Sequence, residues 1–144
     1  RVIHLGKAHT PTWARQATAE MKRNPRYLWK GEVPTWRVRR EYARTQLMVI
    51  SSNQEGGANV VSEALVAGVP VIASDIPGNI GLLGPDYHGY YPVGDETTLA
   101  VLLHRAETDP EFLKGLVQHG RQLRENFLPH QEAAGWHRLV KLVS

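Results

Sequence analysis

The chain has 144 residues, of which 42% are hydrophobic and 22% charged, and its net charge is +3. This length suits one compact domain, and the composition is that of an ordinary soluble globular protein, with no apolar run near the roughly 20 residues that a membrane-spanning helix needs. The absence of cysteine excludes disulfides and thiolate chemistry, and we expect a cytoplasmic protein.

The first third of the chain alternates short apolar runs with amphipathic segments. Short apolar runs closed by glycine or polar residues are typical of buried parallel strands, and proline near a polar residue marks helix boundaries. In chain order we predict a strand at 2–6, a helix from Thr10-Pro11 to Asn24-Pro25, a strand at 26–31, a helix from Val33-Pro34-Thr35 to about Arg44, and a strand at 47–51.

The same alternation continues through the rest of the chain. Glycine and proline dominate residues 76–89, which favours a loop, and Asp95 is placed to cap a helix. In chain order we predict a helix from about Asn59 to Ala67, a strand at 70–74, the loop at 76–89, a strand at 89–93, and helices at 97–108, 110–126 and 130–143.

Two of the predicted helices carry apolar residues at helical spacing. We expect the helix at 59–67 to bury Val60, Val61, Ala64 and Leu65. The leucines of the next helix, Leu99, Leu102 and Leu103, should share one face.

Alternating strands and helices predict the fold class. Right-handed crossovers give an α/β protein with a doubly wound, Rossmann-like parallel sheet and helices on both faces. Ligands of such sheets bind outside the carboxyl ends of the strands. Those ends fall at Gly6-Lys7, Gly31-Glu32-Val33, residues 51–59 and residues 74–79.

The segment EGGANVVSEALVAGVP (55–70) places two glutamates eight positions apart around a turn of small residues. The first amide groups and positive dipole end of the helix that begins near Asn59 suit a phosphate. Glu63, one turn later, is suited to two neighbouring hydroxyls such as those of a ribose, and Glu55 to another polyol group. The pattern fits a nucleotide sugar, although a surface glutamate near a helix start is the alternative that the residues alone leave open.

The same segment carries a family resemblance. EGGANVVSEALVAGVPVIAS (55–74) closely resembles the E-x7-E segment of retaining GT-B glycosyltransferases of group 1, the GT4 type. KGEV (30–33) is similar to the F-L-G-x-V stretch of that family, and GYYPVGDETTLA (89–100) to its G-D-x-x-x-L-A stretch. Together these segments cover nearly the whole chain.

The resemblance implies a role for individual residues. Glu55 would contact hydroxyls of the donor sugar as the catalytic residue, Gly57 and Ala58 would line the sugar pocket, Asn59 and Val60 would offer backbone N–H groups to the diphosphate, Glu63 would bind the ribose, and Gly31 and Val33 would lie beside the base.

The resemblance also implies how the chain works. Residues 1–144 would be the donor-binding domain for a UDP-linked sugar, which is transferred with retained configuration and without a divalent metal. The acceptor-binding N-terminal domain, with the Arg/Lys pair that neutralises the leaving diphosphate, would precede residue 1, so we expect this fragment alone to be inactive. A nucleotide-sugar epimerase of the same architecture and a non-catalytic binding module are the alternatives.

This chain departs from the family pattern at two places. Gly57-Ala58 stands where the family commonly has Phe-Gly, and Pro77-Gly78-Asn79 replaces a glycine pair followed by glutamate. A narrower resemblance is to the selenosugar synthases of selenoneine biosynthesis. It rests on the segments EGGANVVSEA, SDIPGNIGLLG and YHGYYPVGD, and it implies selenophosphate as the acceptor.

The remaining conspicuous residues favour structural roles. Seven histidines lack metal-ligand spacing, although His9 follows the first strand as a possible active-site neighbour. The four tryptophans are expected to be packing anchors, and Lys7 and Lys30 lie near strand ends within reach of a phosphate. WRVRREYAR (36–44) is either a solvated helix face or a surface for an anionic partner, and no motif indicates nucleic-acid binding.

Overall fold

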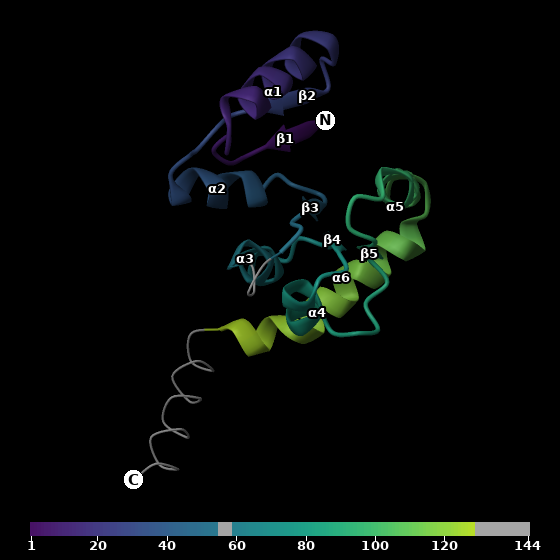
Figure 1. Ribbon diagram of the computed structural model, residues 1–144. Helices are drawn as coiled ribbons and strands as arrows, with labels where there is room; N and C mark the ends of the chain where they lie inside the picture. The colour runs from purple at the N-terminus through teal and green to yellow at the C-terminus, as the bar shows by residue number, and fades with distance from the viewer. Residues whose placement is uncertain (55–58, 129–144) are drawn as a thin grey trace. The chain divides into compact units, whose positions relative to one another are not determined.

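The computed structural model describes residues 1–54 and 59–128 (Figure 1). The chain divides into two compact units, residues 1–44 and residues from Thr45 onward. The helix expected at 130–143 lies outside the described residues. No helix in the described ranges combines the length and apolar character needed to cross a membrane.

The first unit is built on two parallel strands, β1 (Val2–His4) and β2 (Tyr27–Trp29), in the register Ile3 to Leu28. Helix α1 (Pro11–Arg23) joins them and packs against β2. It begins where the sequence predicts, because the Thr10 hydroxyl accepts the Trp13 N–H at 3.1 Å. Helix α2 (Thr35–Tyr42) follows β2.

Aromatic side chains form much of the interior of this first unit. The ring of Trp13 meets that of Trp29 edge-on, with centroids 5.6 Å apart, and meets His4 at 5.0 Å. Nδ1 of His4 and the hydroxyl of Tyr27 are hydrogen bonded at 2.6 Å, and burial lowers the pKa of His4. The expectation that the tryptophans are packing anchors is therefore confirmed for Trp13 and Trp29.

The second unit contains a three-stranded parallel sheet in the order β3-β4-β5, formed by Met48–Ile50, Val71–Ser74 and Tyr90–Tyr91. Every residue of the central strand β4 is buried, as its short, mostly apolar sequence predicts. The helices of this unit are α3 (Asn59–Ala67), α4 (Pro77–Leu83), α5 (Glu96–Thr108) and α6 (Pro110–Arg124), followed by the short 3₁₀ helix η1 (Glu125–Phe127).

Helix α3 packs against β4 and α6, and α6 also packs against α5 (Figure 1). Leu65 of α3 and Leu116 of α6 are almost completely buried. The two helices approach closely at Gly120, where a Cβ atom would lie 3.2 Å from Cδ2 of Leu65. Helices α5 and α6 begin as predicted, with the carboxylates of Asp95 and Asp109 accepting backbone N–H groups.

The fold class is confirmed: the chain is an α/β protein with parallel strands and helices on both sides. Some local predictions were wrong. Residues 77–83 form helix α4 rather than a loop: Pro77 occupies its first turn, and Gly78 and Gly81 lie inside it without a positive φ. The strands at 26–31 and 89–93 shrink to Tyr27–Trp29 and Tyr90–Tyr91.

Three expected core residues are exposed instead. Val60 is 40% exposed at the start of α3, and Leu103 is 38% exposed although Leu102 beside it is buried. Trp36 is 56% exposed on α2 and packs into no core. Val60 and Leu103 lie at the margin of the buried stripe of their helices, and Trp36 lies opposite the half-buried side of α2.

Candidate functional site at the strand ends

The carboxyl ends of β1 and β2 are held together by backbone and indole hydrogen bonds. The N–H of Gly6 donates to the carbonyl of Gly31 at 2.9 Å, and Nε1 of Trp29 donates to the carbonyl of Gly6 at 2.9 Å. Gly31 has φ = +66°, a conformation that favours glycine. The segment carrying Gly31 and the half-buried Val33, the predicted base-binding residues, is thus positioned by its neighbours within the first unit.

Lys30, predicted as a possible phosphate contact, is engaged elsewhere. Its Nζ donates to Oε1 of Glu41 at 2.5 Å. This hydrogen bond is the largest cause of the lowered pKa of Glu41. Because both side chains belong to the first unit, Lys30 ties β2 to α2 in this structure.

Helix α3 places the described part of the two-glutamate segment at the amino end of a buried helix. Val61, Ala64 and Leu65 anchor its inner face, so that Asn59 and Glu63 are exposed on the outer face. Asn59 and Glu63 lie four residues apart and therefore share one side of the helix, as predicted. The hydroxyl of Ser62 donates to the Asn59 carbonyl at 2.8 Å. The side chain of Glu63 is exposed to solvent.

A buried polar chain links the ends of β3 and β4 to α4. Nδ2 of Asn79 donates to the carbonyl of Ser74 at 2.9 Å and lies 3.2 Å from its hydroxyl, and the Ser74 hydroxyl donates to the carbonyl of Ser52 at 2.7 Å. Asn79 and Ser74 are fully buried, and Oδ1 of Asn79 has no partner within the described part of the chain. Asn79 thereby holds the end of β4, and Ser74 connects that end to Ser52, which follows β3.

Sequence reasoning identified Ser74 through Asn79 as a strand end but missed this buried connection. The signal available was an asparagine beside a buried strand that ends in serine, since buried amides must find hydrogen-bond partners. Asn79 stands near the place where the family commonly has glutamate, but its side chain is inside the protein and not on a ligand-facing surface.

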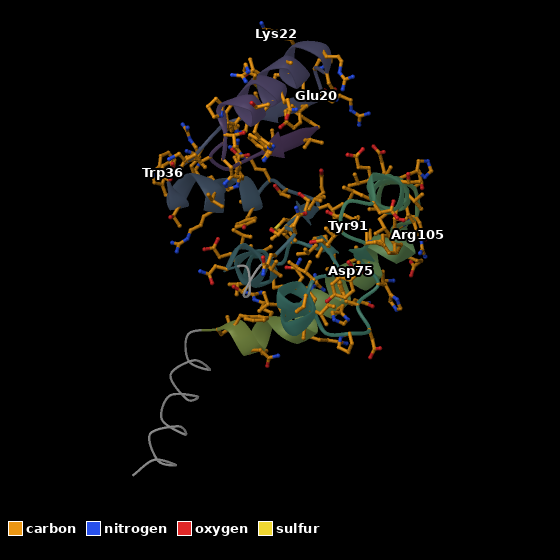
Figure 2. All side chains as sticks on the ribbon, viewed as in Figure 1. Glu20, Lys22, Trp36, Asp75, Tyr91 and Arg105 are labelled. Atoms are coloured by element: carbon orange, nitrogen blue, oxygen red, sulfur yellow. The ribbon has the colours of Figure 1, made fainter. Side chains whose placement is uncertain are left out.

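Tyrosines of β5 complete this end of the sheet. The hydroxyl of Tyr91 donates to the carbonyl of Ile50 at 3.2 Å, and the N–H of Asp75 donates to the carbonyl of Tyr91 at 3.0 Å. Figure 2 labels Asp75 and Tyr91 in this region. Burial raises the pKa of Tyr91, and raises that of Tyr90 to about 12, so both hydroxyls stay protonated hydrogen-bond donors at neutral pH.

Glu55, Gly57 and Ala58, the predicted donor-sugar residues, lie outside the described residues. Of the remaining predicted residues, Asn59, Val60 and Glu63 lie in the first two turns of α3, whereas Gly31 and Val33 belong to the first unit. Across residues 1–54 and 59–128, no three histidine, aspartate or glutamate side chains are grouped so that they could hold a metal ion.

These features define a Rossmann-like α/β protein, in which each unit has hydrogen-bonded groups at the carboxyl ends of its own parallel strands. The chain belongs to the family of glycosyl transferases group 1, whose model matches residues 5–123.

Solved structures of GT-B glycosyltransferases share the fold. Sucrose-phosphate synthase from Thermosynechococcus elongatus matches with a TM-score of 0.77 and 21% identity, over 99% of this chain and 39% of that one. The pneumococcal O-GlcNAc transferase GtfA, in complex with UDP and GlcNAc, matches with a TM-score of 0.78 and 20% identity, over 98% and 29%. HepE of Anabaena, in complex with UDP-glucose, matches with a TM-score of 0.71 and 17% identity, over 87% and 38%. The chain thus spans well under half the length of each of these structures.

Proposed function

We propose that this chain is the donor-binding domain of a retaining, GT4-type glycosyltransferase that uses a UDP-linked sugar. The observation that carries the proposal is the group 1 family match over residues 5–123, which includes both glutamates of the E-x7-E segment. Two structural neighbours hold UDP or UDP-glucose, which supports a uridine nucleotide as the donor.

The proposed donor site follows from the position of α3. The amide groups of the first turn, at Asn59 and Val60, face the diphosphate, where the helix dipole favours negative charge. Glu63 accepts hydrogen bonds from the two ribose hydroxyls. Glu55 contacts the donor sugar, with Gly57 and Ala58 lining its pocket.

Gly31 and Val33 lie beside the base in this proposal. The bond between the sugar C1 and the diphosphate oxygen breaks, its electron pair leaves on the diphosphate, and the acceptor bonds to C1 on the face that the diphosphate left. The departing diphosphate is stabilised electrostatically, and the transfer needs no divalent metal.

Replacing Glu63 with alanine is expected to weaken UDP binding by about 10-fold or more, because hydrogen bonds to a charged group contribute about 1.5–3 kcal/mol. Glu63 is exposed and contributes nothing to the core, so the fold should be unchanged. Isothermal titration calorimetry on the full-length protein measures the affinity.

The matched control is Glu111→Ala, which removes another exposed glutamate of the second unit. A sharper test replaces UDP with 2′-deoxy-UDP, which lacks one of the two hydroxyls. The Glu63→Ala loss should shrink with this ligand, because one of the hydrogen bonds is already gone. An equal loss with both ligands would show that Glu63 does not bind the ribose. If the protein bound no nucleoside diphosphate at all, the proposed donor site would be wrong.

The resemblance to selenosugar synthases makes selenophosphate the acceptor that we propose. The selenium atom would form the new bond to C1, and UDP would leave. We expect the full-length protein to convert a UDP-sugar and selenophosphate to UDP and a selenosugar phosphate, detected by mass spectrometry. UDP- and GDP-sugars with and without selenophosphate form the panel. Transfer only to other acceptors would show that selenophosphate is not the acceptor. Isomerisation of the donor alone would identify an epimerase. Binding of the donor without turnover would identify a non-catalytic binding module.

A further inference from the structure

Helix α2 presents an outward face on which no residue is buried. Trp36 is 56% exposed, and Arg37, Arg39 and Arg40 are exposed beside it. We refer to these four residues as the Trp36 face. Figure 2 shows Trp36 at the start of α2. A large indole held in solvent on a structured helix is uncommon, because tryptophan is highly buried on average.

The helix geometry explains this exposure. At about 3.6 residues per turn, Val38 and Tyr42 share one side of α2, and Trp36 and Arg40 fall on the opposite side. Val38 and Tyr42 are accordingly half-buried. The guanidinium carbon of Arg37 lies 5.5 Å from the centroid of the Trp36 ring, so a cation accompanies the indole.

The unit that carries this face is strongly positive. Residues 1–44 contain eleven lysines and arginines but three glutamates, a net charge of +8, whereas the other hundred residues carry six basic and eleven acidic ones, a net charge of −5. The acid of α2, Glu41, is hydrogen bonded to Lys30. Within the described part of the chain, no arginine of the Trp36 face forms a salt bridge, and the acid on which Arg37 acts electrostatically is Glu41.

We propose that the Trp36 face binds an anionic phospholipid surface. Guanidinium groups pair with phosphate oxygens in bidentate fashion, and indole rings favour the headgroup level of a bilayer. Each basic residue near such a surface raises the partition coefficient about fivefold. This binding is independent of the donor and acceptor of the glycosyltransferase.

A nucleic acid fits the Trp36 face less well. Proteins that bind single strands combine a basic groove with several aromatic side chains on which successive bases stack. Helix α2 has eight residues and offers one indole, and two hollows found in the described residues are lined by other elements. An exposed helix face with one indole at its start and arginines along it suits a broad anionic surface.

Vesicle co-sedimentation with the full-length protein tests the proposal. We expect binding to vesicles that contain phosphatidylglycerol, little binding to phosphatidylcholine alone, and a loss of binding at high salt. Arg39→Glu combined with Arg40→Glu should lower the partition coefficient about 25-fold or more. Brominated lipids should quench the tryptophan fluorescence of the wild type more than that of Trp36→Phe.

The matched control is Arg15→Glu combined with Lys22→Glu. Both side chains are exposed on α1 of the same unit. It makes the same change in net charge away from the Trp36 face and should retain most of the binding. An equal loss of vesicle binding in both double variants would show that binding depends only on net charge, and this would overturn the proposal. Absence of binding to phosphatidylglycerol would also overturn it. Tighter binding of a single-stranded oligonucleotide, lost with Arg39 and Arg40, would assign the face to nucleic acid instead.

Discussion

Replacing Glu55 with alanine is expected to slow sugar transfer by the full-length enzyme about 100-fold or more, a loss of about 2.7 kcal/mol of transition-state stabilisation. UDP affinity should change less than about threefold, because the proposed contact of Glu55 is with the sugar and not with the nucleotide. Steady-state transfer rates and calorimetry with UDP measure the two quantities on the same preparation.

This split follows from the proposed order of the donor along the segment, with the sugar at Glu55, the diphosphate at the start of α3 and the ribose at Glu63. A carboxylate that orients the sugar affects the geometry in which C1 reacts, whereas the nucleotide supplies binding. Glu55→Gln should be intermediate, because it keeps the size and one acceptor oxygen but loses the charge.

The control for Glu55 is Gln54→Ala, one residue earlier and exposed. It should leave both transfer and UDP affinity within about twofold of the wild type, an effect of at most about 0.5 kcal/mol. Equal losses of transfer and UDP affinity in Glu55→Ala would refute the sugar-facing role. An equally slow Gln54→Ala enzyme would show that any change in the segment disturbs the site.

The sequence predicted the alternation of strands and helices well, because the signals lie within single segments. Val71, Ile72 and Ala73 are apolar, the first two are β-branched, and the central strand β4 that they form with Ser74 is completely buried. Capping residues marked helix starts equally well, as at Thr10 and Asp95. Such local preferences act before any tertiary contact is known.

The errors arose where tertiary packing decides the outcome. Glycine and proline in residues 76–84 indicate a loop by composition, yet α4 forms because Leu83 and Asn79 are buried against the rest of the second unit. Val60 and Leu103 are apolar residues at helical spacing, but each lies at the margin of a buried stripe whose width depends on the neighbouring elements. A sequence pattern gives the direction of the stripe and not its width.

The candidate site was predictable only in part. The exposed positions of Asn59 and Glu63 on one side of α3 follow from helical spacing, and the structure confirms them. The connection from Asn79 through Ser74 to Ser52 spans residues up to 27 positions apart, and only the folded sheet brings them together. The roles of these residues toward a donor stay predictions.

Asn79→Asp is expected to cost about 3–5 kcal/mol of unfolding free energy at pH 8, because an ionised carboxylate would be buried without a partner. The wild-type side chain is fully buried, and its donor Nδ2 faces the carbonyl oxygen of Ser74. The aspartate would present an acceptor to that carbonyl, next to an Oδ1 position that already has no partner among the described residues. Urea unfolding followed by circular dichroism measures the loss.

The deficit of Asn79→Asp should depend on pH in a defined direction. Burial disfavours the charged carboxylate and raises its pKa in the folded state above the unfolded value of about 3.9. The protonated form can donate to the carbonyl of Ser74, so stability is largest below about pH 4 and is lost as pH rises through the folded pKa. Relative to the wild type at each pH, the deficit at pH 5 should therefore be smaller than at pH 8. Asn126→Asp, at an exposed position, should show a small deficit at both values. A deficit for Asn79→Asp that is equally large at pH 5 and pH 8 would show that steric disruption, and not buried charge, is the cause.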